Sequence, residues 1–264
     1  MKRILTGLLL IAGWLALLYI NSFFLFWLVI LLVSGIGLLE FFTITGSDKD
    51  KSIRPLLIAV SLLPLFFSFS QQPLITYSGF FAAFTLNALL VIFFFSALKT
   101  PFDTFVKTIF GLTYIGFASA HLNLLMALDN GAAWLLVLTT ITAASDSGAY
   151  FIGKNFGKKK LCPSLSPGKT IEGFVGGLVF GTLGAFAVAL VVLNDINMII
   201  LAFAAIAISC LGVLGDLTES MLKRSMNVKD SGSILPGHGG ILDRVDSLLM
   251  TAPLFYYLIY FKIL

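Results

Sequence analysis

The chain has 264 residues, of which 58% are apolar, 14% are aromatic and only 11% are charged, with a formal net charge of +4. A soluble globular domain carries about 25% charged residues, so this chain has too few to cover a compact body in water. The composition therefore excludes a soluble enzyme, a disordered chain and a nucleic-acid-binding protein, and it indicates a lipid bilayer. The two cysteines, Cys162 and Cys210, have neither disulfide nor metal-ligand spacing.

Apolar runs long enough to cross about 30 Å of hydrocarbon recur along the whole chain. They predict an all-α polytopic integral membrane protein. Pro55 and Pro64 fall inside the third run and predict a kinked helix there. Without a repeat or a linker, we expect a single membrane domain over 1–264, with scaffold helices in 1–128 and catalytic helices and cytoplasmic loops in 129–264. The predicted transmembrane helices number about nine and cover residues 4–20, 23–45, 53–70, 74–98, 104–127, 132–152, 171–193, 198–217 and 248–263.

The basic residues are distributed asymmetrically between the two sides of these predicted helices. All Lys and Arg residues except Lys262 fall in alternate connections, starting with the N-terminus, whereas the turns at 71–73, 129–131 and 194–197 contain none. Basic residues are retained on the cytoplasmic side of a membrane. The pattern therefore predicts a cytoplasmic N-terminus and a C-terminus on the opposite side.

Polar residues concentrate after residue 145. Asp146 lies within an apolar helix, where a carboxylate either bonds a neighbouring helix or serves a function. The basic run Lys158-Lys159-Lys160 is typical of an anchor to anionic lipid headgroups.

The segment 164–173 contains Gly168-Lys169-Thr170, which looks like the end of a P-loop. The glycine that a P-loop requires five positions earlier is replaced by Pro163, so this interpretation is rejected. The segment instead predicts a turn that opens a helix near Ile171, and free N–H groups at a helix N-terminus beside Lys169 suit a phosphate. Glu172 is either an ordinary first-turn acid or part of the site.

A third polar region, residues 216–246, carries the acids that indicate chemistry. Asp216, Glu219, Ser220 and Lys223 share one helix face, and Asp243 and Asp246 are neighbours at the start of the last helix. Carboxylates from these helix ends suit Mg²⁺, which usually shares phosphate oxygens from a substrate. Glycines at 237, 239 and 240 let a backbone approach a phosphate closely. The region predicts metal-assisted phosphoryl or nucleotidyl transfer at the cytoplasmic membrane edge.

The same residues carry a family resemblance. The stretch 220–246, which includes Leu235-Pro236-Gly237-His238-Gly239-Gly240-Ile241-Leu242-Asp243-Arg244-Val245-Asp246, resembles the hallmark of phosphatidate cytidylyltransferases, also called CDP-diacylglycerol synthases. Residues 146–150 and 166–173 are similar to further stretches of that family, with mild departures at Ser147 and Ile171. The N-terminal half is similar only in being a set of apolar helices.

The resemblance implies that CTP and phosphatidic acid form CDP-diacylglycerol and pyrophosphate with Mg²⁺, and that a monovalent cation such as K⁺ is a candidate beside the metal. It also implies a homodimeric enzyme of the bacterial inner membrane, surrounded by membrane lipids, with its active site facing the cytoplasm. The predicted metal ligands are Asp216, Asp243 and Asp246, and the predicted catalytic residues are these three with Lys223, Arg224 and Arg244. The predicted substrate-binding residues are Asp146, Ser166, Lys169, Thr170, Glu172, Lys229, His238, Gly239 and Gly240.

Two alternatives remain from the sequence. A CTP-dependent kinase of a polyprenol or other lipid alcohol would share CTP and Mg²⁺ but transfer the γ-phosphoryl group. A secondary transporter would use Asp146 for a coupling ion, although transporters usually show repeat symmetry and this chain does not. The pattern of a CDP-alcohol phosphotransferase is not found in the sequence.

Overall fold

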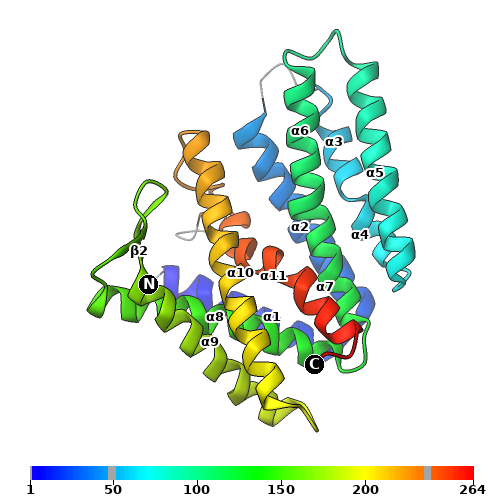
Figure 1. The fold of residues 1–264 in the computed structure, drawn as a ribbon. Coiled ribbons are helices and arrows are strands. Elements are labelled where there is room, and N and C mark those ends of the chain that lie inside the picture. The colour runs from blue at the N-terminus through cyan, green and yellow to red at the C-terminus, as the bar shows by residue number, and fades with distance from the viewer. Residues whose placement is uncertain (1, 47–51, 235–238) are drawn as a thin grey trace. The chain divides into compact units, whose positions relative to one another are not determined.

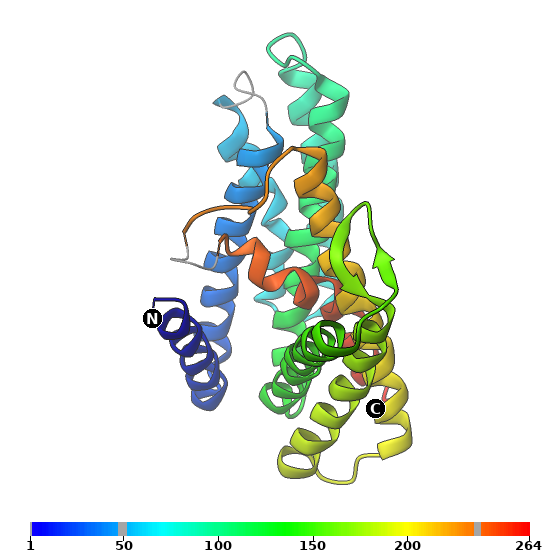
Figure 2. The same cartoon turned by 90° about the vertical axis from the view of Figure 1, so that its left-hand side faces the viewer.

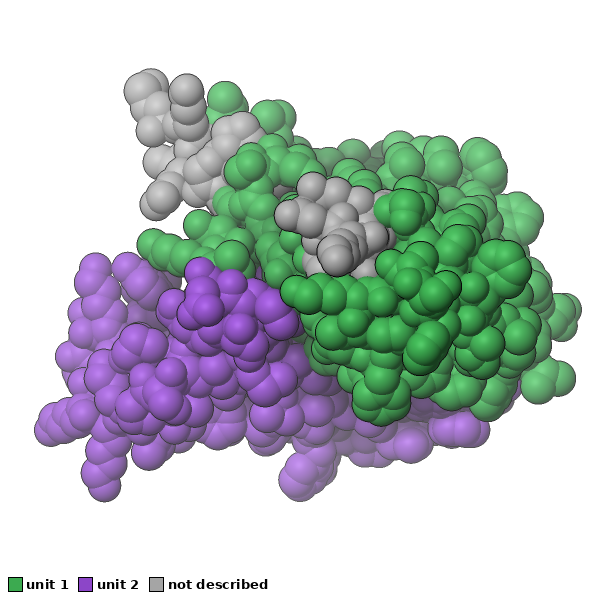
Figure 3. Space-filling model, turned by 90° about the horizontal axis from the view of Figure 1, so that it is seen from above, with its two compact units in different colours: residues 1–127, 228–244 green, residues 128–227, 245–264 purple. Residues whose placement is uncertain are grey.

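The computed structural model describes residues 2–46, 52–234 and 239–264, with side chains from residue 5 onward. The chain divides into two compact units, coloured separately in Figure 3. The N-terminal unit comprises Met1–Ala127 and Val228–Arg244, and the C-terminal unit comprises Leu128–Asn227 and Val245–Leu264. Residues 228–244, which follow the C-terminal helices in the sequence, therefore pack with the N-terminal helices.

Before residue 127, the regular elements that the structure describes in the N-terminal unit are all helices (Figure 1). Its core is apolar and aromatic, with Phe26, Leu38, Leu112 and Leu125 fully buried. Its elements are α1 (Lys2–Ile20), α2 (Phe23–Thr45), α3 (Arg54–Ser61), α4 (Leu63–Ser68), α5 (Pro73–Phe93), α6 (Pro101–Gly111), the π-helical turn η2 (Leu112–Phe117) and α7 (Ala118–Met126).

The kink predicted near Pro64 is confirmed as a break between α3 and α4. The first helix ends at Ser61 and the second begins at Leu63, with Pro64 in its first turn. Proline has no N–H to continue the helical hydrogen bonds, so the chain restarts a helix there. Gly116 of η2 lies directly against the Ser61 carbonyl, where a Cβ would not fit.

The C-terminal unit contains three long helices, most of a fourth, and a small hairpin. The hairpin projects beyond the ends of α8 and α9 (Figure 2), and it pairs Lys160 with Thr170 and Cys162 with Ser166 in antiparallel register. The sequence predicts an all-α chain with only a turn in this segment, and the two strands correct that prediction. The elements are α8 (Gly131–Phe156), β1 (Lys160–Cys162), β2 (Ser166–Thr170), α9 (Ile171–Val192), α10 (Met198–Ser225) and α11 (Leu242–Tyr260), whose first residues belong to the N-terminal unit.

Small residues let α9 pack closely on α8. The buried positions of α9 are all glycine or alanine: Gly173, Gly176, Gly177, Gly181, Ala185 and Ala189. Small residues at such spacing are a common means of close helix approach in membranes. A Cβ on Gly177 would lie 3.0 Å from the Ser145 carbonyl oxygen on α8. This close contact fixes the part of α8 that carries Asp146.

Among the described residues, six helices are long and apolar enough to cross a membrane. Each of the six overlaps a transmembrane segment predicted from the sequence. Two other predicted segments correspond to shorter apolar helices, Leu5–Ile20 and Arg54–Ser68. In α11, Asp243, Arg244 and Asp246 occupy the beginning of the helix, so its apolar part is shorter than the helix itself. The finer count of nine and the orientation of the termini stay predictions. The six candidate spans are Phe23–Thr45, Pro73–Phe93, Pro101–Met126, Gly131–Phe156, Ile171–Val192 and Met198–Ser225.

Candidate functional site

The C-terminal unit brings together an acidic cluster, which we define as Asp146, Asp216 and Asp246. Asp216 lies on α10, and α11 approaches α10 closely beside it. The Asp246 carbonyl oxygen fills the position that a Cβ on Gly215 would take, and Ser247 donates its hydroxyl to the Gly212 carbonyl at 3.1 Å. The glycines of α10 thus determine where the first turns of α11 pack.

The charges of this cluster act on one another. Burial raises the pKa of the Asp246 carboxyl, and the negative charges of Asp216 and Asp146 raise the pKa further. The N–H of Ser247, which Asp246 accepts at 2.7 Å, and the positive charge of Lys223 act in the opposite direction. Several like charges gathered in this way favour a cation among them.

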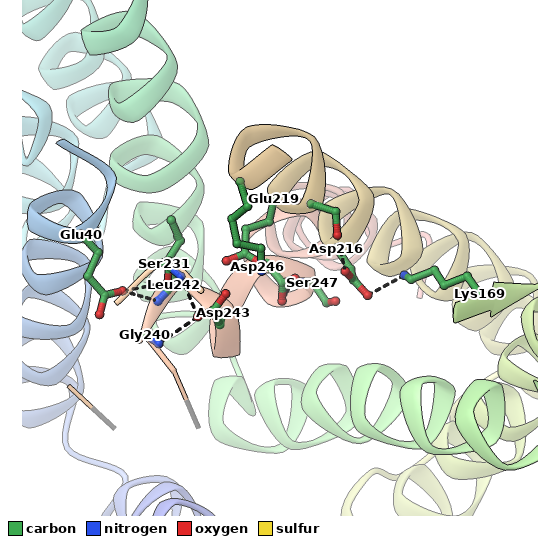
Figure 4. A network of polar contacts seen from close by, with 12 residues as sticks. Glu40, Lys169, Asp216, Glu219, Ser231, Gly240, Leu242, Asp243, Asp246 and Ser247 are labelled. Atoms are coloured by element: carbon green, nitrogen blue, oxygen red, sulfur yellow. Dashed lines mark hydrogen bonds and ion pairs between the residues drawn. The ribbon is translucent and has the colours of Figure 1, made fainter. Parts of the chain in front are cut away.

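Two lysines supply positive charge to this part of the unit. Lys169, from β2, places its Nζ 2.5 Å from Oδ2 of Asp216 (Figure 4). Lys223 forms an ion pair of 2.9 Å with Glu219 one turn earlier on α10, and Glu219 is only 2% exposed. The predicted shared face of α10 is therefore confirmed, and the structure adds Glu219 as a buried partner of Lys223.

In the N-terminal unit, two carboxylates hold the segment that leads into α11 (Figure 4). Asp243 accepts the N–H groups of Ser231 and Gly240 through Oδ2, at 3.0 and 2.8 Å. Glu40 of α2 accepts the N–H groups of Ile241 and Leu242, at 3.0 and 2.9 Å, and the Ser231 hydroxyl at 3.2 Å. We call Glu40 and Asp243, with the groups they bind, the carboxylate clamp.

The glycines of this segment face carboxylates. Gly239 has a φ of 79°, a conformation that glycine adopts without strain. A Cβ on Gly239 would lie 2.6 Å from Oδ2 of Asp243, and a Cβ on Gly240 would lie 2.5 Å from Oε2 of Glu40. In the structure these glycines lie against side-chain carboxylates, and the approach to a phosphate stays a prediction.

Thr170 and Glu172 organise the hairpin and the start of α9. Thr170 caps α9, because its hydroxyl accepts the Gly173 N–H at 3.0 Å. Glu172 accepts the backbone N–H groups of Lys158 and Lys159, at 3.0 and 3.2 Å. Both side chains therefore have structural partners in addition to the substrate contacts predicted for them.

The remaining predicted residues are more exposed. Lys229, Arg224 and Arg244 have exposed side chains, as does Asp146 on α8, and Ser166 is half-buried in β2. His238 lies outside the described residues. Asp243 belongs to the N-terminal unit, whereas Asp216 and Asp246 belong to the C-terminal unit.

The donor set suits a magnesium ion that shares ligands with a substrate. Over residues 5–46, 52–234 and 239–264, no group of three or more His, Cys, Asp or Glu side chains is arranged to hold a metal ion by itself. Mg²⁺ typically takes one or two carboxylates together with substrate phosphates. Asp216 and Asp246 in one unit match that requirement. An ionised carboxylate offers about four acceptor sites, so the hydrogen bonds of Asp243 are compatible with a cation ligand as well.

Sequence reasoning missed Glu40 and gave Glu219 no role. Glu40 is 6% exposed and lies in α2, a candidate span that otherwise contains no charged residue. A carboxylate inside a membrane helix is costly unless it is partnered, so its presence alone was the available signal. Its partners, about 200 residues later in the chain, were not predictable.

Comparison with known proteins assigns this arrangement to a class. The model of the cytidylyltransferase family matches residues 1–262, and the chain belongs to that family. It is 37% identical over 241 residues to the phosphatidate cytidylyltransferase of Bacillus subtilis, a match that covers 87% of each chain. It is 48% identical over 139 residues to the phosphatidate cytidylyltransferase of Haemophilus influenzae, covering 50% of this chain and 47% of that protein. A Staphylococcus haemolyticus protein of the same name is 45% identical over 126 residues, 48% of each chain.

Proposed function

We propose that this chain transfers the cytidylyl group of CTP to phosphatidic acid, which gives CDP-diacylglycerol and pyrophosphate. The observation that carries the proposal is the family match over residues 1–262, together with a relative named phosphatidate cytidylyltransferase that covers 87% of the chain. The acidic cluster and the lysines beside it support nucleotidyl transfer, because this reaction moves highly charged phosphates.

The reaction requires one bond to form and one to break at the α-phosphorus. A phosphate oxygen of the lipid attacks the α-phosphorus of CTP in line, and the bond from that phosphorus to the bridging oxygen breaks, which releases pyrophosphate. The lipid phosphate is already anionic near neutral pH, so a strong general base is unnecessary. We assign the stabilisation of the departing pyrophosphate to Lys223, Arg224 and Arg244.

The other assignments follow from the chemistry of the side chains. Asp216, Asp243 and Asp246 would hold Mg²⁺, with K⁺ as the candidate monovalent cation beside it. Bound there, Mg²⁺ would neutralise charge on the reacting phosphates. Lys169 would exchange its ion pair with Asp216 for a nucleotide phosphate. The side chains proposed to line the substrate site are Asp146, Ser166, Lys169, Thr170, Glu172, Lys229, His238, Gly239 and Gly240.

The proposed setting is the inner membrane of a bacterium, with the active site on the cytoplasmic side and the enzyme a homodimer. The six apolar helices found in the part of the chain that the structure describes, and the bacterial sources of the relatives, support a membrane location. The basic residues at alternate connections support nine spans with a cytoplasmic N-terminus and a C-terminus on the opposite side.

The deciding experiment incubates the purified chain with Mg²⁺, phosphatidic acid and CTP labelled at either the α- or the γ-phosphorus. We expect the α-label in CDP-diacylglycerol and the γ-label in pyrophosphate. Transfer of the γ-label to a lipid would instead identify a CTP-dependent lipid kinase. No labelled lipid from either CTP would contradict the proposal.

A further inference from the structure

Glu40 is a buried carboxylate, and among the described residues its hydrogen-bond partners belong to one distant segment. It lies in the last two turns of α2, and it binds Ser231, Ile241 and Leu242, which are 191 to 202 residues later in the chain. Both carboxylate oxygens are engaged, Oε1 by Ile241 and Oε2 by Leu242 and Ser231. A carboxylate at 6% exposure needs such partners, because an unpaired buried charge is very costly.

Glu40 accepts hydrogen bonds at the N-terminus of α11, where backbone N–H groups lack acceptors within the helix. The first N–H groups of a helix have no partner within the helix, and they form the positive end of its dipole. Glu40 takes the N–H groups of Ile241 and Leu242 at the start of α11. The N-terminus of α11 is thus already occupied by a carboxylate from α2.

Glu40 and Asp243 share Ser231 as a hydrogen-bond partner. Ser231 gives its hydroxyl to Glu40 and its N–H to Asp243. Gly232 and Gly240 leave room for Glu40, and a side chain at either position would collide with its carboxylate. Removing Glu40 would therefore release Ser231, whose N–H bonds Asp243, and Leu242, which precedes Asp243 in the chain.

We infer that Glu40 is a positioning residue: it sets the first turn of α11, and through it Asp243, in the geometry that cytidylyl transfer requires. The inference rests on the proposed function, since Asp243 and Asp246 are assigned there to the metal. The sequence predicts α2 as part of the scaffold. The inference gives this helix a role in positioning Asp243, a proposed metal ligand. Glu40 itself touches neither substrate nor metal in this assignment.

The test compares Glu40→Gln with Thr45→Val in the full-length chain in detergent. Glutamine keeps the shape of Glu40 but places an amide group against backbone N–H donors. Thr45 is a matched control, because it is also buried on α2 and its hydroxyl donates to the Phe41 carbonyl of the same helix. Two readouts are taken: amide hydrogen exchange at Ile241 and Leu242, and the turnover of CTP with phosphatidic acid.

In Glu40→Gln we expect exchange at Ile241 and Leu242 to accelerate and turnover to fall by about tenfold to a hundredfold, the range for an unsatisfied buried donor. KM for CTP should stay near its original value, because Glu40 does not contact the nucleotide. Thr45→Val should leave exchange and turnover unchanged. Ser231→Ala removes one hydrogen bond to Glu40, so we expect a smaller loss of turnover from it. If Glu40→Gln does not fold, the same two measurements on Ser231→Ala test the inference.

Unchanged exchange at Ile241 and Leu242 in Glu40→Gln would overturn the inference, whatever the turnover. Faster exchange with full turnover would overturn it too, because the clamp would then have no catalytic consequence. Failure of the unaltered chain to form CDP-diacylglycerol would overturn the proposed function while the exchange data still report on the clamp. The two failures are therefore distinguishable.

Discussion

Asp243 has two tasks at the start of α11. Its Oδ2 accepts the N–H groups of Ser231 and Gly240, and the proposed function also assigns its negative charge to Mg²⁺. An ionised carboxylate can accept several bonds at once, whereas an amide has one oxygen and two N–H donors. The residue is therefore sensitive to a change that preserves its size and shape.

The first prediction is that Asp243→Asn lowers turnover by at least about a thousandfold. A metal that neutralises phosphate charge contributes several kcal/mol to the barrier, and each 1.36 kcal/mol is tenfold in rate. The helices should survive, because a neutral amide is cheaper to hold at the membrane edge than a carboxylate. The measurement is the Mg²⁺ dependence of CDP-diacylglycerol formation at matched expression.

Asp195→Asn is the control for this change. Asp195 is exposed in the turn between α9 and α10 and has a φ of 56°, which asparagine also tolerates. We expect it to be silent. Activity near the original level in Asp243→Asn, with an unchanged Mg²⁺ requirement, would remove Asp243 from the metal site even if the family activity is intact.

The second prediction separates two lysines of the hairpin region. Lys169→Ala removes the ammonium group that pairs with Asp216, so it should weaken the use of CTP. Lys159→Ala should be nearly silent, because the hydrogen bond of Lys159 to Glu172 is made by its backbone N–H and its side chain is exposed. A surface lysine near an anionic leaflet contributes only about 1 kcal/mol to membrane attraction. Turnover and KM for CTP check this, and equal severe losses would mean that the phosphate site is wider than proposed.

At the scale of elements, the packing of α8 on α9 depends on glycine. A Cβ on Gly148 of α8 would lie 2.9 Å from the Gly176 carbonyl oxygen and closer still to the side chain of Phe180. Backbone cannot move away from such a contact without separating the helices. Because α8 carries Asp146 and α9 follows the strand of Lys169, this spacing positions part of the acidic cluster.

The third prediction is that Gly148→Ala destabilises the C-terminal unit by about 1–3 kcal/mol, the usual cost of overpacking. Gly13→Ala is the control, since a Cβ there meets nothing within 4 Å and alanine favours a helix. Thermal unfolding in detergent measures both. A melting temperature that is unchanged in Gly148→Ala would show that α8 and α9 can separate at little cost.

At the scale of the whole molecule, the asymmetry of basic residues predicts which side each loop faces. The hairpin before α9 is rich in lysine, whereas the turn at 194–197 after it contains none. A single candidate span, Ile171–Val192, separates the two. Their relative sidedness therefore does not depend on the total number of spans.

The fourth prediction places single cysteines at Lys159 and at Asn194 in a background without Cys162 and Cys210. A membrane-impermeant thiol reagent should label the first from the cytoplasmic side and the second from the opposite side, because lysine-rich loops are retained in the cytoplasm. Labelling experiments on intact cells and on inverted vesicles make the comparison. Labelling of both positions from one side would contradict the proposed topology and move the site out of the cytoplasm.

Hydropathy and motif spacing are local properties of the chain. They were sufficient to predict the membrane character, the break at Pro64 and the shared face of α10. Each depends on residues a few positions apart, so the pattern is visible without a fold. The hairpin of β1 and β2 was not predicted, because its strands are short and polar and lack the alternation that marks a strand.

The sequence by itself thus determined that this is a membrane protein with acidic and basic residues suited to nucleotidyl transfer, and the hallmark around Asp243 indicated its family. Only the tertiary structure decided what each carboxylate touches. Glu40 bonds Ile241 across 201 positions, and Lys169 reaches Asp216 from a separate element. The physical reason is that a buried charge is costly unless it is paired or hydrogen-bonded. Its partners are the groups that tertiary packing brings next to it, and these can be far away in the sequence.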